Sequence, residues 1–132
     1  MSDEDAVTDL DVARAYAIEV VGKKVELNDG DVVNVRFKLR RDADPSVSVF
    51  VCNHHGLPGM AADDESSWRE SGVARELPGL GDSAFVNDEG TVFARLGDRY
   101  TIQILTVGDP DDEIVAGSTA LARSILDRLD KG

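Results

Sequence analysis

The chain has 132 residues, of which 42% are hydrophobic and 30% are charged, and its formal net charge is −12. This size and composition are typical of one globular domain, 1–132, in which only 1–7 is expected to be flexible. The acidic charge argues against a nucleic-acid partner and against docking on an anionic membrane, because both require a basic surface.

A single cysteine, Cys52, is present, so no intramolecular disulfide can form. No apolar run approaches the roughly 18 residues of a membrane span, and the acidic start is unlike a signal peptide. We therefore expect a cytoplasmic protein with no integral membrane segment. The alternative is an extracytoplasmic domain expressed without its leader.

The first predicted element is a helix over 9–21. Thr8 is a suitable N-cap, apolar residues recur at helical spacing as far as Val21, and Gly22 ends the pattern.

A β-rich segment follows this helix. A short strand, 25–27, leads into the turn 28–31, which has the sequence Asn-Asp-Gly-Asp. The next strand, 33–39, alternates strictly between apolar and polar residues, which is typical of a sheet with one buried face. A turn at 42–45 then leads to a more apolar strand over 47–52.

The pattern is irregular over 53–81, where a short helix is expected at 61–69. A three-strand meander is then predicted at 83–86, 91–96 and 100–105, joined by glycine-containing turns.

The last element is an amphipathic helix. Asp109 is its expected cap, Pro110 suits the first helical position, and apolar residues recur from Ile114 to Leu129. The chain is therefore predicted to be α+β, with a mostly antiparallel sheet of five to six strands and N- and C-terminal amphipathic helices packed on it.

Cys52, His54 and His55 form the sharpest candidate site, because thiol and imidazole groups are ligands for zinc or copper. Met60 follows closely in the sequence and is a further soft ligand. The alternative interpretation is a buried cysteine at a strand end, followed by two surface histidines. A nucleophilic Cys52–His54 pair is less favoured, because no third group that would orient it can be identified.

The second candidate site is a basic stripe in which Arg36, Lys38 and Arg40 share one face of a strand. It could bind an anionic ligand or an acidic partner segment. Alternatively, these side chains pair with neighbouring carboxylates or discourage edge-to-edge aggregation. Trp68 is an interaction anchor if exposed, or fixes the irregular segment to the core if buried. The acidic cluster 63–65 is interpreted as solvated surface.

One stretch carries a resemblance to known proteins. The PGLGD motif at 78–82, followed by 91–95 and 97–100, resembles the C-terminal half of small actinobacterial lipoprotein or sensor-type domains of unknown function. The resemblance implies an extracytoplasmic binding or accessory domain with a Mog1/PsbP-like arrangement, and it supplies no catalytic residue. This chain departs from the pattern, since it has no lipid-acceptor cysteine and no second cysteine to pair with Cys52.

The sequence thus favours a non-enzymatic binding or accessory domain that recognises a protein partner or a small molecule. The expected site is a sheet face or a groove near 53–81. A metal-binding protein using Cys52, His54 and His55 is the first alternative, and an enzyme with a dispersed, unrecognised site is the second.

Overall fold

The computed structural model describes residues 3–40, 46–106 and 111–131. Its helices are the 3-10 turn η1 (Asp3–Ala6), α1 (Asp9–Tyr16), α2 (Met60–Glu70) and α3 (Asp112–Lys131). Its strands are β1 (Val20–Asn28), β2 (Val32–Leu39), β3 (Ser46–Asn53), β4 (Arg75–Glu76), β5 (Ser83–Val86), β6 (Val92–Leu96) and β7 (Tyr100–Thr106).

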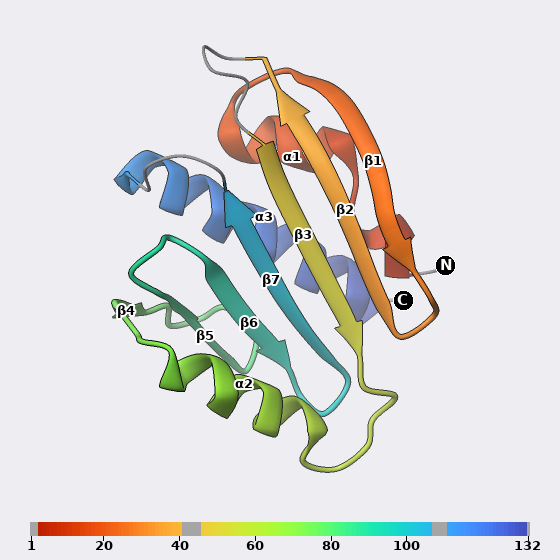
Figure 1. Ribbon diagram of the computed structural model, residues 1–132, viewed down its shortest axis with the longest axis vertical. Coiled ribbons are helices and arrows are strands. Elements are labelled where there is room, and N and C mark those ends of the chain that lie inside the picture. Colours follow the sequence, from red (N-terminus) through yellow and green to blue (C-terminus); the bar gives the residue numbers. More distant parts are fainter. Residues whose placement is uncertain (1–2, 41–45, 107–110, 132) are drawn as a thin grey trace.

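The seven strands found in the described residues join one antiparallel sheet in the order β1-β2-β3-β7-β6-β5-β4. The two consecutive meanders meet where β3 pairs with β7, and Val49 and Val51 lie there opposite Ile104 and Ile102 (Figure 1). The predicted α+β class is confirmed, with one strand more than expected because the short β4 extends the edge beyond β5.

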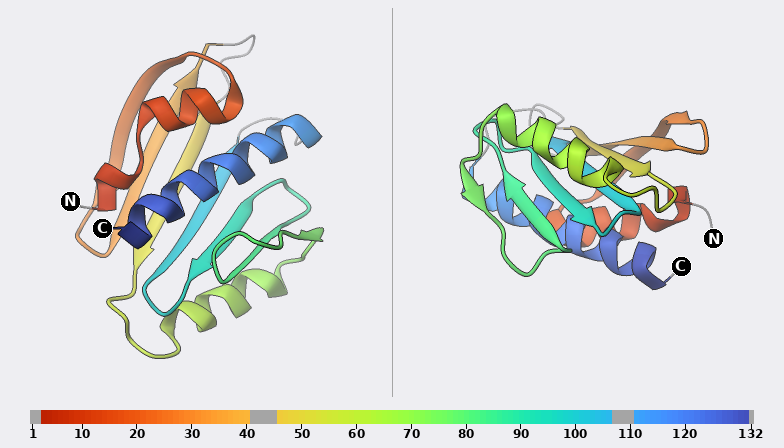
Figure 2. Two further views of the ribbon diagram at one scale, coloured as in Figure 1. Left: turned by 180° about the vertical axis from the view of Figure 1, so that it is seen from behind. Right: turned by 90° about the horizontal axis from the view of Figure 1, so that it is seen from below.

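The helices lie on both sides of this sheet. Helices α1 and α3 share one face, whereas α2 lies on the other face and packs on β6 and β7 (Figures 1 and 2). The side of β1–β3 that faces away from α1 and α3 therefore has no described helix in front of it.

The main core lies between the sheet and the α1–α3 layer. Val35 and Phe37 of β2 are fully buried, as are Leu121 and Ile125 of α3. The intervening β2 residue Arg36 is exposed. The alternation seen in the sequence thus directs the apolar side chains of β2 toward the helices.

The N-terminal helix is shorter than the predicted 9–21. It begins as expected, with Thr8 Oγ1 accepting a hydrogen bond from the Asp11 amide, but it ends at Tyr16, and Ala17 is left-handed with a φ of 54°. Strand β1 starts at Val20, which pairs with Leu39 of β2. Pairing with the amphipathic strand β2 thus prevails over a helical periodicity that continues to Val21.

The segment before α1 was expected to be flexible, yet its described part is packed. Ala6 and Val7 are 0% and 1% exposed. Asp3 accepts hydrogen bonds from the Tyr100 hydroxyl at 3.0 Å and from Asn53 Nδ2 at 3.2 Å. These contacts fix η1 against the ends of β3 and β7.

The final helix begins at Asp112, and the side chain that caps it is Asp111, whose Oδ1 accepts a 2.8 Å hydrogen bond from the Ile114 amide. The predicted cap Asp109 and the adjacent Pro110 lie outside the described residues, as does the predicted turn at 42–45. Within the described ranges, no helix combines the length and the apolarity that a membrane crossing requires.

Candidate functional site

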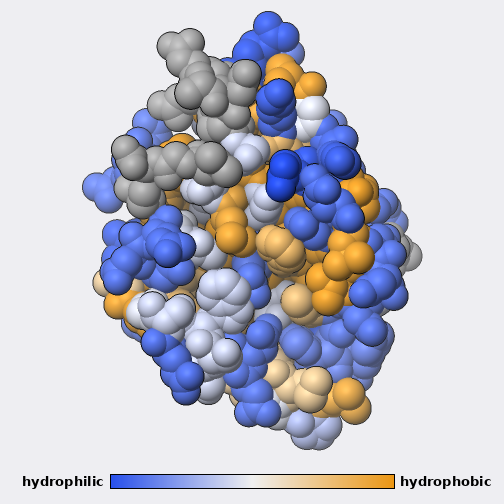
Figure 3. Space-filling model, viewed as in Figure 1, coloured by the Kyte–Doolittle hydropathy of each residue, from blue (hydrophilic) through white to orange (hydrophobic). Residues whose placement is uncertain are grey.

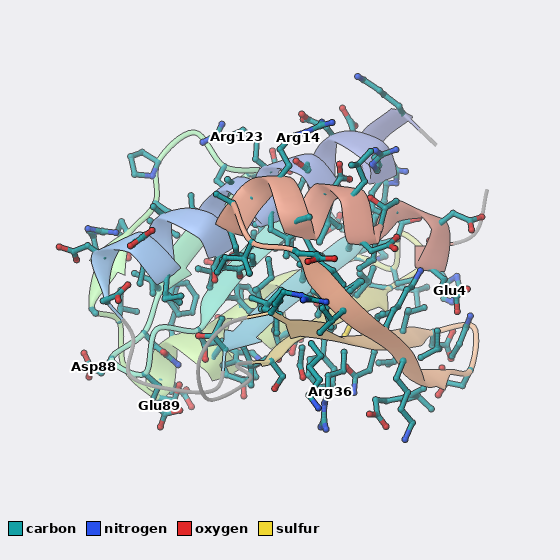
Figure 4. All side chains as sticks on the ribbon, turned by 90° about the horizontal axis from the view of Figure 1, so that it is seen from above. Glu4, Arg14, Arg36, Asp88, Glu89 and Arg123 are labelled. Atoms are coloured by element: carbon teal, nitrogen blue, oxygen red, sulfur yellow. The ribbon has the colours of Figure 1, made fainter. Side chains whose placement is uncertain are left out.

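The side of β1, β2 and β3 that faces away from α1 and α3 is here termed the open face. Figure 4 shows Arg36 on this side of the sheet, with Arg14 and Arg123 on the helix side. Directly paired residues of antiparallel strands share a face. The pairings of Arg36 with Lys24 and Ser48 therefore extend the open face to both neighbouring strands.

One end of the open face is basic. A pocket of about 420 Å³ is lined there by Gly22, Lys23, Lys24, Arg36, Lys38 and Ser46. Glu26 partly balances these charges, since its carboxylate lies 3.8 Å from Lys24 Nζ and 3.7 Å from Arg36 Nε. The predicted grouping of Arg36 with Lys38 is therefore found. Arg40 does not line this pocket and instead pairs with Glu19 at 2.8 Å.

The middle of the open face exposes apolar side chains among polar ones (Figure 3). Leu27 of β1 is 45% exposed and pairs with Asn34 of β2. On the other side of Asn34, its partner Phe50 of β3 is partly exposed. Asn34 Oδ1 is buried and has no hydrogen-bond partner among the described residues. Leu27 and Phe50, here together termed the apolar strip, thus lie at the surface on either side of Asn34, between the two ends of β2.

The opposite end of the open face contains an acidic pocket of about 570 Å³. Its walls combine apolar and polar side chains from the end of β3, the following loop and the start of α2. The lining residues are Asp31, Val32, Cys52, Asn53, His54, His55, Leu57, Met60, Asp63 and Asp64. This volume, with apolar walls and convergent polar groups, is typical of ligand sites.

A hydrogen-bonded chain forms one side of the acidic pocket. The hydroxyl of the fully buried Thr101 donates to Asp64 Oδ2 at 2.7 Å, and His54 Nε2 lies 3.0 Å from the same hydroxyl oxygen. A hydroxyl has only one proton to donate. His54 Nε2 must therefore carry a proton and donate it to Thr101, which fixes the orientation of the imidazole.

The two histidines have different partners. His55 Nε2 lies 2.6 Å from Asp31 Oδ1, and both side chains line the acidic pocket. Among the residues that the structure describes, no group of three or more histidine, cysteine, aspartate or glutamate side chains could hold a metal ion. The zinc or copper site at Cys52, His54 and His55 therefore remains a hypothesis from the sequence.

Cys52 is the only cysteine. Burial raises the pKa of its thiol, and the nearby carboxylates of Asp64 and Asp29 raise it further. Since the thiolate is the nucleophilic form, this environment disfavours the Cys52–His54 nucleophilic pair.

The acidic cluster 63–65 is not simply solvated surface, which corrects the sequence-based interpretation. The Glu65 side chain is only 13% exposed, and its carboxylate lies 2.6 Å from Arg69 Nε and 2.7 Å from Arg95 Nε. Ser83 also donates to it at 2.9 Å. These partners come from α2, β6 and β5, so Glu65 anchors the helix to the sheet.

Trp68 adopts the second of its two predicted roles. It is partly buried on α2, and its ring centroid lies 6.2 Å from that of Phe93. It thus packs α2 onto β6, and it lines neither end of the open face.

Comparison of the chain with protein-family models, with curated proteins and with solved structures finds no match.

Proposed function

We propose that the chain is a non-enzymatic binding or accessory domain that docks a protein partner on its open face. The observation that carries the proposal is the apolar strip over β1–β3, which no described helix covers. Large apolar side chains at a surface, bordered by charged ones, are typical of protein interaction sites.

The carboxyl pKa values and the distribution of charge both favour a docking surface over a catalytic site. Of the carboxyl pKa values that are shifted in the described residues, those of Asp11, Asp29, Glu65 and Glu76 are all lowered. A general acid requires the opposite shift. The open face instead offers separated basic and acidic ends around an apolar centre.

A photo-crosslinking amino acid at position 27 tests the proposal in the cells that naturally produce the protein. Leu27 is 45% exposed on the open face. Leu10, which is 62% exposed on α1 behind the sheet, provides a control of the same residue type. We expect a covalent protein adduct from position 27 and none from position 10. No adduct at position 27, or equal adducts at both positions, would contradict the proposal.

The acidic pocket favours a second candidate, the binding of a small molecule. Its volume of about 570 Å³ and its partly apolar lining of Val32, Cys52, Leu57 and Met60 suit a drug-sized ligand. Native mass spectrometry of the purified chain distinguishes the two candidates. A retained organic adduct, lost when Leu57 is changed to aspartate, would support the small molecule.

A further inference from the structure

We infer that the partner on the open face is a second copy of this chain, bound face to face around a two-fold axis. The inference rests on the proposed function and adds the identity of the partner. It follows from the placement of the two charged ends of one surface.

The basic and acidic ends lie at opposite ends of β2. Lys38 lines the basic pocket and Val32 lines the acidic one. The six residues of rise between them correspond to about 20 Å. The apolar strip around Leu27 and Phe50 lies in between.

This arrangement is complementary to itself. A two-fold axis that lies in the plane between the two open faces, and that runs across the strands near the middle of β2, would place the basic end of each copy against the acidic end of the other. Each dimer would contain this contact twice. In each contact, Lys24 and Lys38 of one copy would face Asp31 and Asp63 of its partner.

The net charge of −12 on each copy opposes association. At physiological ionic strength, however, the Debye length is about 8 Å, so charges outside the interface are largely screened. Oppositely charged groups in direct contact within a partly dehydrated interface are screened much less. The local attraction therefore prevails over the long-range repulsion.

The size of the face sets the strength of the dimer. Strands about 4.8 Å apart and eight residues long give β1, β2 and β3 a combined face of about 380 Å². A standard stable interface buries about 800 Å² per partner. We therefore expect a reversible dimer with a dissociation constant in the micromolar range.

Two charge-reversed variants provide the decisive test. The first, Lys24→Glu with Lys38→Glu, makes both ends acidic, and the second, Asp31→Lys with Asp63→Lys, makes both ends basic. In sedimentation velocity from about 1 to about 500 µM, we expect a wild-type dimer and at least tenfold weaker self-association of each variant. An equimolar mixture of the variants should restore the dimer as a heterodimer.

A control variant tests whether the effect depends on where the charges are changed or only on the change in net charge. Asp127→Lys with Asp130→Lys makes the same change in net charge as Asp31→Lys with Asp63→Lys, but at exposed positions on α3, and should dimerise like the wild type or better. Circular dichroism verifies that every variant is folded.

A monomeric wild type at all concentrations would overturn the inference. It would also be overturned by variants that dimerise like the wild type, or by a mixture of variants that stays monomeric. The crosslink at position 27 then separates the two proposals. An adduct with a different protein rejects only the second copy, whereas no adduct rejects the docking face as well.

Discussion

The environment of Cys52 predicts an unreactive thiol. Its pKa is raised by burial first, with the Asp64 and Asp29 carboxylates adding to the rise. We expect the folded protein to react with a disulfide reagent more slowly than N-acetylcysteine at the same pH. The rate should still be rising above about pH 9, where a free thiol is largely ionised. The same reaction in urea, where the chain is unfolded, should match the small thiol, and a folded-state rate that levels off by about pH 8.5 would contradict this prediction.

At the residue scale, the sequence could predict those side-chain positions that depend only on residues nearby in the chain. Arg36 and Lys38 share a face because side chains alternate along a strand, and this needs no tertiary information. The role of Glu65 could not be predicted, because its partners Ser83 and Arg95 lie 18 and 30 residues away. The acidic pocket likewise needs Asp31 beside the loop after β3, and no local pattern encodes this proximity.

At the element scale, the attachment of α2 depends on Glu65. Burial alone would raise the pKa of Glu65, but hydrogen bonds from Arg95, Arg69 and Ser83 together hold it below its usual value. A lowered folded-state pKa gives stability that is present above the pKa of the unfolded chain and is lost as the pH falls through the folded-state value. We expect Glu65→Gln to lower the free energy of unfolding at pH 7 by about 1.5–3 kcal/mol in urea titrations.

The control for this substitution is Glu70→Gln, an exposed position at the end of the same helix. It should change the free energy of unfolding by no more than about 0.5 kcal/mol. The difference between wild type and Glu65→Gln should shrink toward pH 3, because protonation removes the same charge from the wild type. A difference that does not depend on pH would show that the ion pairs are not its cause.

Close packing of α1 on α3 makes a second prediction at this scale. Gly117 faces Tyr16, and a Cβ atom at position 117 would collide with the tyrosine ring. The Tyr16 hydroxyl is also held 2.6 Å from Ser118 Oγ, so the ring cannot move away freely. We expect Gly117→Val to lower the free energy of unfolding by about 1–3 kcal/mol. The exposed neighbour provides the control, since Ala116→Val should cost less than about 1 kcal/mol. Equal costs at the two positions would contradict the close contact.

The elements themselves were largely predictable, but their limits were not. The meander β5–β7 and the helix α2 follow from turn residues and local periodicity, and the structure has them close to the expected positions. The end of α1 differs because the stretch that ends at Val21 fits both a helical period and a strand, and only the pairing of Val20 with Leu39 decides between them. A tertiary contact therefore set the boundary that local spacing left open.

At the scale of the whole molecule, the sequence could not predict the pairing of β3 with β7. These central strands are separated in the sequence by α2, β4, β5 and β6, so no turn specifies their register. What directs the pairing is the match of two apolar surfaces, with Val49 and Val51 opposite Ile104 and Ile102. The open face follows from the same pairing, because it places α2 over β6 and β7 and leaves β1–β3 without it.

The charge of the whole molecule predicts how salt affects its stability. With 26 acidic and 14 basic residues, the folded chain concentrates a net charge of −12 in a compact volume. Raising the NaCl concentration from 0.01 to 0.15 M shortens the Debye length from about 30 Å to about 8 Å. Short, half-buried pairs such as Glu65–Arg95 are screened less than this long-range repulsion.

We therefore expect the melting temperature to rise over this range, by a few degrees for about 1 kcal/mol of relieved repulsion. Differential scanning fluorimetry at two protein concentrations measures this rise and identifies any contribution from dimerisation, because only that contribution depends on protein concentration. The rise should be steep at low salt and should level off once screening is complete. A flat or falling curve would mean that favourable ion pairs outweigh the net repulsion, and a linear rise continuing beyond 0.5 M would indicate exclusion of salt from the surface instead.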